Sequence, residues 1–204
     1  MTTEPGSLRR QPKGDKRDRT RATLLEAARS LIREKGHDHA TLDAIAERAG
    51  MTTGAIYGNF KNRDELFLAL GQTYWAPIKP NVRPRATFPE IMRALADATL
   101  AAIPDRSAAA VGRLTGLAYT LKHEEFRAKV AEFTAQSYAL GEQWLRSVTK
   151  EDDLPMPADQ LVRVIHALTE GLVFQRLLTP ELIPDDIFRA AFAALGKKAK
   201  RQLH

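Results

Sequence analysis

Apolar residues recur along the chain at intervals of three and four positions, which is the spacing of one face of an α-helix. Short clusters of Gly, Pro and charged residues interrupt this pattern. The sequence shows neither strand-like alternation of apolar and polar residues nor a repeat of fixed period. The pattern predicts an all-α protein. Its helices are expected at about residues 20–35, 41–49, 52–60, 62–75, 87–103, 105–121, 124–149, 158–178 and 184–196.

The stretch from Thr41 to Phe60 predicts two short helices joined by a tight turn. Gly50 lies between them and suits the left-handed position that ends a helix. Thr52 can then cap the second helix with its hydroxyl. A helix, a glycine turn and a second helix form a helix-turn-helix, whose second helix can enter the major groove of DNA.

The second helix of this motif carries two glycines, Gly54 and Gly58, on the side away from its apolar residues. Each glycine inside a helix costs about 1 kcal/mol relative to alanine. This cost is explained if a partner must approach the helix backbone closely; the alternative is a poor surface helix on an ordinary core. Tyr57, Lys61 and Arg63 near this face suit phosphate oxygens.

Positive charge is concentrated at the N-terminal end of the chain. The first 63 residues hold 13 Lys and Arg against 8 Asp and Glu, whereas residues 64–196 hold 14 against 17. Residues 1–19 contain few apolar residues and many charges, which predicts a disordered basic arm. This arm either follows DNA or only makes the protein soluble. The charge distribution favours a polyanionic partner beside the helix-turn-helix.

Several other classes of protein are disfavoured. The chain has no cysteine, which excludes disulfides and thiolate chemistry. The longest apolar run falls short of the roughly 20 residues that span a bilayer, and no secretory signal is recognised, so we expect a cytoplasmic protein that does not enter the membrane. A nucleophile with a base, a phosphate-binding glycine loop and a cluster of metal ligands are not recognised. We therefore expect neither an enzyme nor a cofactor.

Two pairs of residues could suggest a metal site. His37 and His39 lie close in sequence, and His166 and Glu170 are one helical turn apart. Neither pair has a further ligand motif nearby, so no metal is expected. We expect His37 to pack against the small N-terminal core instead. His166 and Glu170 could also serve a proton relay or an interfacial hydrogen bond.

Residues 17–70 resemble the N-terminal domain of the TetR family of bacterial transcriptional regulators. The resemblance rests on TLDAIAERAG, the turn and TTGAIYGNFKNRDELF, with Gly54, Ile56, Tyr57, Phe60 and Leu66 at the matching spacing. Two positions depart from the family. The family often has histidine at the position of Asn59 and lysine at the position of Arg63. The resemblance implies DNA contacts at or beside the second helix, by Thr41, Thr52, Thr53, Gly54, Tyr57, Asn59, Lys61 and Arg63.

The resemblance also implies the organisation of the whole chain. Four prolines between residues 77 and 89 prevent a regular helix and mark a seam between two domains. We expect a basic arm over residues 1–19, a DNA-binding domain over residues 20–66 and a ligand-binding and dimerisation domain over residues 67–204. The implied assembly is a homodimer through the helices of residues 158–178 and 184–196, bound to a palindromic DNA operator.

A small, largely apolar organic effector is expected inside the C-terminal domain, in a cavity with a few polar groups. Each residue proposed for this pocket could equally be ordinary core with a locally satisfied hydroxyl. The leading hypothesis is a regulator, most simply a repressor, that the effector releases from DNA. The alternative is an architectural DNA-binding protein without an effector. The proposed pocket residues are Thr99, Tyr119, Phe126, Phe133, Ser137, His166, Thr169 and Phe174.

Overall fold

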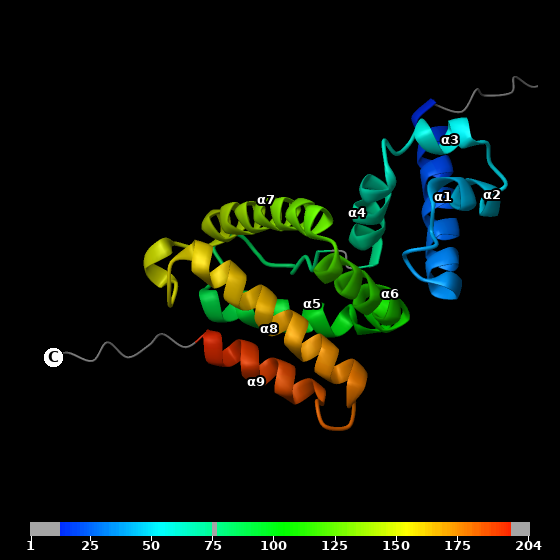
Figure 1. Ribbon diagram of the computed structural model, residues 1–204. Helices are drawn as coiled ribbons and strands as arrows, with labels where there is room; N and C mark the ends of the chain where they lie inside the picture. Colours follow the sequence, from blue (N-terminus) through cyan, green and yellow to red (C-terminus); the bar gives the residue numbers. More distant parts are fainter. Residues whose placement is uncertain (1–12, 75–76, 197–204) are drawn as a thin grey trace, which may run out of the picture. The chain divides into compact units, whose positions relative to one another are not determined.

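The computed structural model describes residues 13–74 and 77–196 (Figure 1). Within these residues all regular secondary structure is helical, which confirms the predicted class. The chain divides into two compact units, Met1–Thr73 and Tyr74–His204. The α-helices are α1 Lys13–Lys35, α2 Leu42–Arg48, α3 Thr53–Tyr57, α4 Arg63–Tyr74, α5 Phe88–Ala101, α6 Ile103–Lys122, α7 Glu124–Val148, α8 Ala158–Leu178 and α9 Asp185–Leu195, with a short 3-10 helix η1 at Glu151–Asp153.

Helix α1 begins at Lys13, so residues 13–19, expected in a disordered arm, are helical. Low hydropathy does not prevent a helix here, because Lys and Arg are good helix formers. The hydroxyls of Thr20 and Thr23 donate to main-chain carbonyls one turn earlier, each at 3.0 Å. The remainder of the predicted arm, residues 1–12, lies outside the described residues.

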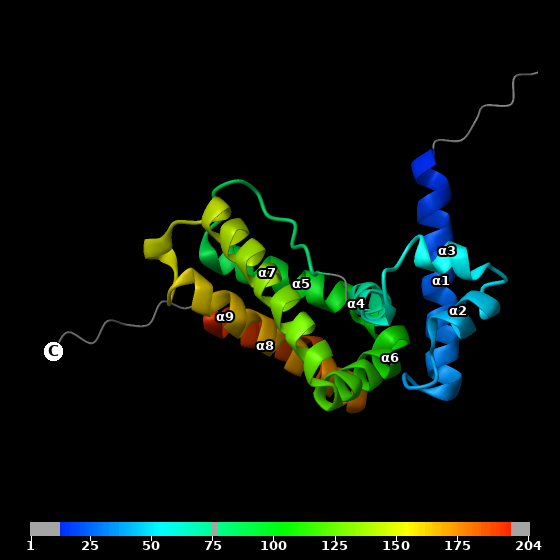
Figure 2. The same cartoon turned by 45° about the horizontal axis from the view of Figure 1, so that its top comes forward.

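The first unit is built on α1, which packs against both α2 and α3 (Figures 1 and 2). Helix α4 contributes buried apolar residues as well, and for this reason the division between the units falls at the end of α4 rather than at the expected residue 66. The buried residues of this unit include Leu24, Ala28, Leu31, Ile32, Ile45, Ile56, Phe60, Leu66 and Leu70.

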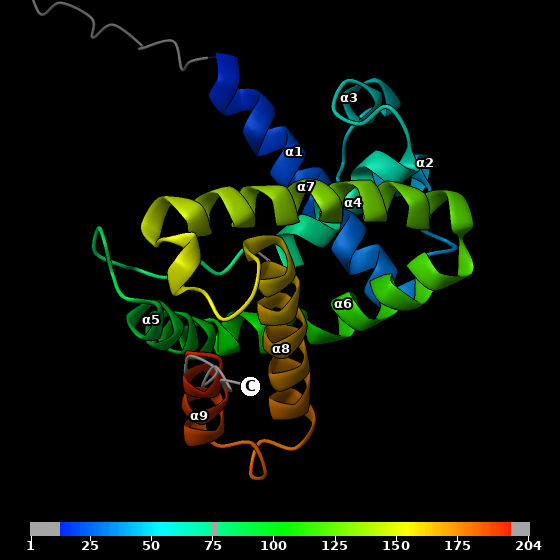
Figure 3. The ribbon, with the colours of Figure 1, turned by 90° about the vertical axis from the view of Figure 1, so that its left-hand side faces the viewer.

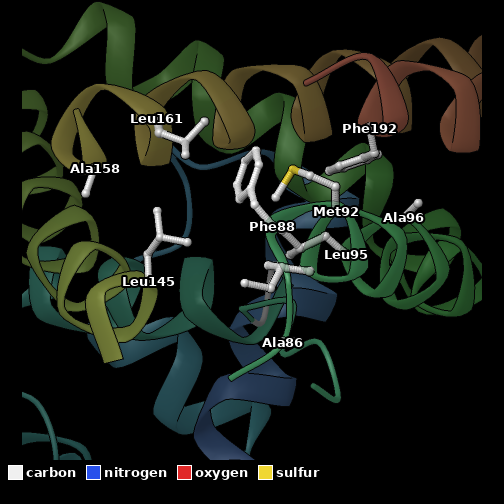
Figure 4. Close-up of a cluster of buried hydrophobic side chains, with 10 residues drawn as sticks. Ala86, Phe88, Met92, Leu95, Ala96, Leu145, Ala158, Leu161 and Phe192 are labelled. Atoms are coloured by element: carbon white, nitrogen blue, oxygen red, sulfur yellow. The ribbon is translucent and has the colours of Figure 1, made fainter. Parts of the chain in front are cut away.

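The second unit has its apolar core where α5, α9 and the adjoining ends of α7 and α8 meet (Figure 4). Phe88 and Phe192 are both buried in this cluster, and α5 packs along α9. Helix α5 starts with a capping box, in which the carboxylate of Glu90 accepts the N–H of Thr87 at 2.8 Å. Hydrogen bonds from the main-chain N–H and the hydroxyl of Thr87 and from Arg83 lower the pKa of Glu90 to about 2.

The start of α6 differs from the prediction. The helices predicted over residues 87–103 and 105–121 leave Pro104 between them. Instead α6 begins at Ile103, with Pro104 in its first turn and Asp105 inside the helix. Proline fits there because the first N–H groups of a helix have no partner within it. Ala102 flanks both α5 and α6.

The apolar residues of α6 are largely turned to solvent, whereas those of α7 are exposed only in part. Val111 and Leu114 on α6 are 70% and 46% exposed, and Phe133 and Leu140 on α7 are exposed as well. The buried residues of α6 are Arg106 and Tyr119, and those of α7 are Phe126 and Leu145. Helical spacing identifies an apolar stripe without identifying what covers it.

Helices α8 and α9 match their predicted ranges closely and run in opposite directions from a short loop (Figure 3). Arg176 at the end of α8 closes this loop, since its Nη2 lies 2.7 Å from Oδ1 of Asp185. Among residues 13–74 and 77–196, no helix combines the length and the apolar character needed to cross a membrane. The same residues contain no group of three or more His, Asp or Glu side chains placed to hold a metal ion.

Candidate nucleic-acid interface

The turn of the helix-turn-helix has the predicted backbone. Gly50 adopts φ of 64°, a left-handed conformation that favours glycine. Thr52 caps α3 as predicted, because its hydroxyl accepts the N–H of Ala55 at 3.3 Å. Thr41 caps α2 in the same way, with its hydroxyl 3.2 Å from the nitrogen of Ala44. Both helices of the motif therefore begin at a threonine.

Helix α3 is shorter than the predicted helix of residues 52–60. It ends at Tyr57, so Gly58 is its C-cap and only Gly54 lies within it. A Cβ at Gly58 would come within 3.2 Å of the carbonyl oxygen of Gly54, whereas a Cβ at Gly54 would meet nothing closer than 3.8 Å. The fold itself thus constrains Gly58. It leaves room for a side chain at Gly54.

One side of α3 is buried and the other faces solvent. Ile56 and Phe60 are fully buried in the first unit. Thr53, Gly54 and Tyr57 are exposed, and the Tyr57 ring is 52% accessible. Thr52 and Lys61 at the two ends are exposed too. The structure therefore brings most of the predicted contact residues onto one outward surface, defined by Thr52, Thr53, Gly54, Tyr57 and Lys61 and called the α3 surface below.

Asn59 and Arg63 were predicted to contact DNA, but both have partners within the first unit. The Asn59 amide is half-buried and donates to the carbonyl of Ala55 at 2.8 Å. Arg63 donates to the carbonyl of His37 and places its guanidinium 4.9 Å from the centre of the Phe67 ring. These two side chains join the fold rather than the α3 surface.

Arg21 on α1 holds α3 in place, a role that the sequence did not reveal. Its Nη1 donates to the carbonyl of Asn59 at 2.9 Å, just beyond the end of α3. Its guanidinium also lies 4.2 Å from the centre of the Phe60 ring. Arg21 therefore ties α1 to the C-terminal end of α3. In the sequence it is one of many basic residues at this end of the chain, so no local pattern marks it.

We expect Arg21→Ala to lower the free energy of unfolding of the first unit by about 1 kcal/mol, because a hydrogen bond and a cation–π contact are lost. Arg21→Lys should recover only part of this, since lysine lacks the planar fork. Hydrogen exchange of the α1 amides measures the change. Arg33→Ala, at an exposed position of the same helix, is the matched control; an equal effect of both alanine variants would contradict the role given to Arg21.

Two further contacts fix the segments around α3. The side chain of Asn62 caps α4, with its Oδ1 2.9 Å from the nitrogen of Glu65. The Glu65 carboxylate in turn accepts the main-chain N–H of Lys61 at 2.7 Å, one residue earlier than a capping box requires. The backbone that carries Lys61 is therefore held by two hydrogen bonds of the α4 start.

A bidentate ion pair between Arg48 and Glu34 holds helix α2 on α1. Both terminal nitrogens of Arg48 lie 2.7 Å from the carboxylate of Glu34. Ser30 donates to the same carboxylate at 3.0 Å. Hydrogen bonds from Arg48 and Ser30 lower the pKa of Glu34 to about 2. Because the pair is exposed, its main effect is on the orientation of α2.

His37 packs against the core as predicted. Its ring meets the Phe67 ring edge-on, with centroids 5.2 Å apart. Burial of the ring, with the nearby charge of Arg63, lowers the pKa of His37 from 6.5 to about 4. The folded protein therefore holds His37 neutral at physiological pH.

The eight residues proposed for an effector pocket differ in burial and in hydrogen bonding. The hydroxyls of Thr99, Ser137 and Thr169 each donate to a carbonyl one turn earlier in their own helix, at 2.7, 3.0 and 2.8 Å. This geometry agrees with the alternative interpretation, in which these residues belong to the ordinary core and their hydroxyls bond within their own helix. Phe133 is exposed and Phe174 is half-buried.

Two contacts do form among these residues and their neighbours. Tyr119 and Phe126 meet edge-on with ring centroids 5.4 Å apart. His166 lies 2.9 Å from the hydroxyl of Tyr138 on α7. A groove of about 430 Å³ runs beside this contact and contains none of the eight predicted residues. It is lined by Ala131, Thr134, Ala135, Tyr138, Ala139, Glu142 and Arg163.

Comparison with known proteins identifies the N-terminal segment. The sequence profile of the bacterial regulatory proteins of the tetR family matches residues 24–70. A stretch of 82 residues is 34% identical to the HTH-type transcriptional repressor AcnR of Corynebacterium efficiens and covers 40% of this chain and 43% of AcnR. The HTH-type transcriptional regulator TtgR of Pseudomonas putida is 49% identical over 51 residues, which are 25% of this chain and 24% of TtgR.

The similarity to these curated relatives is confined to less than half of their length. The similarity in fold covers more of the chain than the similarity in sequence. The crystal structure of NalD, described as the secondary repressor of the MexAB-OprM multidrug efflux pump in Pseudomonas aeruginosa, matches with a TM-score of 0.54 at 25% identity. This match covers 88% of the present chain and 96% of NalD. The profile match coincides with the helix-turn-helix described above, so residues 24–70 of this chain are similar to the DNA-binding segment of the bacterial regulatory proteins of the tetR family.

Proposed function

We propose that this chain is a transcriptional regulator that binds a palindromic DNA operator as a homodimer. The observation that carries this proposal is the α3 surface. It presents Thr53, Gly54 and Tyr57 outward on a short helix that Arg21 and Phe60 anchor from behind. Gly54 is exposed and the fold has room for a side chain there. Its lack of a side chain is explained by close approach of a DNA backbone or base edge.

Phosphate contacts are assigned to the hydroxyls and the cation of this surface. Tyr57 and Lys61 lie at its C-terminal end, and Thr52 and Thr41 lie at the starts of α3 and α2. Thr53 and the backbone of Gly54 are assigned to the base edges. Such contacts neutralise phosphates, so the affinity is expected to fall steeply as the salt concentration rises. We leave Asn59 and Arg63 out of the interface because both are bonded within the fold.

The homodimer is assigned to the outward faces of α8 and α9. Val164, Ala167, Gly171 and Leu178 recur at helical spacing on α8 and are all exposed. A Cβ at Gly171 would meet nothing within 4 Å. Ile187, Ala190, Ala193 and Ala194 on α9 are exposed as well. Small and apolar residues at this spacing favour close packing of two identical surfaces about a two-fold axis. Such a dimer suits two operator half-sites about one helical turn of DNA apart, or a little more.

The second unit is assigned to binding a small organic effector that releases the protein from its operator. The relatives AcnR and NalD are repressors, which supports regulation of transcription, and the assignment of repression follows them. A regulator binds its operator with much higher affinity than other DNA sequences, whereas an architectural DNA-binding protein does not. Selection of bound DNA from a random pool distinguishes the two functions, because an architectural protein would enrich no defined palindrome.

We expect Tyr57→Ala and Lys61→Ala each to weaken binding by several-fold to tenfold on every DNA sequence, because phosphate contacts carry no sequence information. The effect of Lys61→Ala should shrink at high salt, as counterion release diminishes. Gel shifts on the selected operator and on a scrambled duplex measure both. Lys122→Ala removes one exposed charge from the second unit and is the control. Unchanged affinity of the Tyr57 and Lys61 variants would remove these residues from the interface.

A further inference from the structure

The buried face of helix α1 leads, towards the N-terminus, to an exposed arginine. Leu24 and Ala28 on this face are fully buried. Arg21 precedes Leu24 by three positions and Arg17 precedes it by seven, and these intervals keep all four residues on one face of the helix. Arg21 is half-buried, whereas Arg17 is exposed. The side of α1 that packs into the first unit therefore ends in a cation that the fold leaves uncovered.

The contacts of Arg21 show where Arg17 lies relative to α3. Arg21 donates to the carbonyl of Asn59 at 2.9 Å and lies 4.2 Å from the centre of the Phe60 ring, so it marks the C-terminal end of α3. Arg17 follows one turn farther along the same face, about 6 Å along the helix axis. In Figure 2 the first turns of α1, in dark blue, continue past α3. Arg17 therefore lies on the side of α1 that meets the end of the α3 surface, where Lys61 is exposed.

No carboxylate of the first unit neutralises Arg17. Arg48, by comparison, lies 2.7 Å from the carboxylate of Glu34. In the part of the chain that the structure describes, Arg17 forms no ion pair. The residues three and four positions away from it are not acidic, and residues 49–63, which include α3, contain neither Asp nor Glu. Its neighbour on the same face is Arg21, and like charges one turn apart destabilise a helix. An anionic partner along this side would relieve that repulsion.

The helical conformation of residues 13–19 bears on the kind of contact that Arg17 can make. A disordered arm would have to become ordered on binding. Arg17 is instead carried by a helix whose following turns are buried in the first unit, so its position relative to α3 is set before binding and less entropy is lost. An α-helix with its side chains is about 10 Å across, whereas the minor groove is about 6 Å wide. The helix therefore suits the outside of the duplex, where the phosphates lie.

We propose that Arg17 binds a phosphate of the DNA backbone, next to the phosphates assigned to Tyr57 and Lys61. The planar guanidinium can donate two parallel hydrogen bonds to one phosphate group. The start of α1 and the end of α3 would then hold the same stretch of backbone. The inference rests on the proposed binding of DNA by the α3 surface and adds a contact from outside the helix-turn-helix.

The first test is a gel shift of the full chain on the selected operator and on a scrambled duplex. Arg17→Ala should weaken binding to both by the same factor, several-fold, and should reduce the salt dependence by about one phosphate contact. Arg17→Lys keeps the charge and should lose less. Arg33→Ala removes one cation from an exposed position near the other end of α1 and should leave the affinity unchanged.

A scan of the phosphates locates the contact. Operators are prepared in which one phosphate at a time is replaced by an uncharged methylphosphonate. The unsubstituted chain should bind at least one of these duplexes several-fold more weakly than the intact operator. Arg17→Ala should bind that duplex and the intact operator equally well, because the contact is already lost. The same comparison with Lys61→Ala should identify a neighbouring phosphate.

Hydrogen exchange of the α1 amides without DNA separates this role from a structural one. Alanine favours a helix and removes the repulsion with Arg21, so exchange in Arg17→Ala should be as slow as in the unsubstituted chain or slower. Faster exchange of residues 16–20 in this variant would mean that Arg17 stabilises the helix, and would overturn the proposal.

The remaining outcomes also decide the proposal. It is overturned if Arg17→Ala binds as tightly as the unsubstituted chain, if Arg33→Ala weakens binding equally, or if Arg17→Ala responds to the same methylphosphonates as the unsubstituted chain. A preference for A·T pairs beside the operator that disappears in Arg17→Ala would place the guanidinium in the minor groove and overturn the backbone assignment. Loss of affinity in Lys61→Ala but not in Arg17→Ala would reject this inference alone, whereas failure to select any defined site would reject the proposed function.

Discussion

Ala167→Glu is expected to convert the dimer to monomers and to lower operator affinity by about a hundredfold or more. Ala167 is exposed at the middle of the α8 face assigned to the dimer, next to Gly171 one turn on. A two-fold axis brings two copies of the same face together, so each substitution places two like charges in one apolar interface. A buried charge without a partner costs about 3–5 kcal/mol. A monomer would retain only one half-site contact.

Light scattering coupled to size exclusion measures the oligomeric state, and a gel shift on the selected operator measures the affinity. Ala128→Glu introduces the same side chain at an exposed position of α7 and should leave both unchanged. The dimer assignment fails if Ala167→Glu remains dimeric. The functional need for the dimer fails if the variant is monomeric but binds the full operator as tightly as the original chain.

Acid is expected to destabilise the first unit through His37. Its pKa is about 4 in the folded protein, against an ordinary value of 6.5, so between these values the unfolded chain binds more protons. Stability therefore falls as the pH drops through this window. Taken in full, the pKa shift of His37 lowers the free energy of unfolding by about 2 kcal/mol between pH 7 and pH 5. Partial exposure of the ring reduces this loss to about 1–2 kcal/mol.

The effect of His37 can be separated from that of the carboxylates. Glu34 and Glu90, whose pKa values are lowered from 4.5 to about 2, lose their contributions only at lower pH. Protection factors of the α1 amides at pH 7 and pH 5 report the stability of the first unit. His37→Gln should make the two values nearly equal, whereas His39→Gln, at an exposed neighbour, should keep the difference. A pH dependence that persists in His37→Gln would assign it to other groups.

The helix-turn-helix could be predicted because its signals are local. Gly50 must adopt a left-handed conformation, Thr52 must cap the following helix, and Ile56 and Phe60 must share one face. The residues that meet these requirements lie close together in the sequence, and the structure shows all three features. The length of α3 was overestimated, because a glycine is compatible both with a helix interior and with a cap and only the backbone shows which it is.

The roles of Asn59, Arg63 and Arg21 could not be predicted, since each depends on a partner distant in sequence. Arg63 is bonded to His37, and Arg21 is bonded to Asn59. A polar residue at the right spacing for a DNA contact looks the same in the sequence whether it faces solvent or another helix. The choice is made when α1, α3 and α4 pack together.

The sequence by itself determined the helical class, the helix-turn-helix and most helix ends of this protein, because helical spacing, caps and breakers act over one or two turns. Only the tertiary structure decided which face of each helix is covered. On α6 it exposed Val111 and Leu114 and placed Arg106 and Arg113 against Glu170. Burial is a property of the neighbours that a helix meets, and in the second unit those neighbours come from segments far apart in the chain.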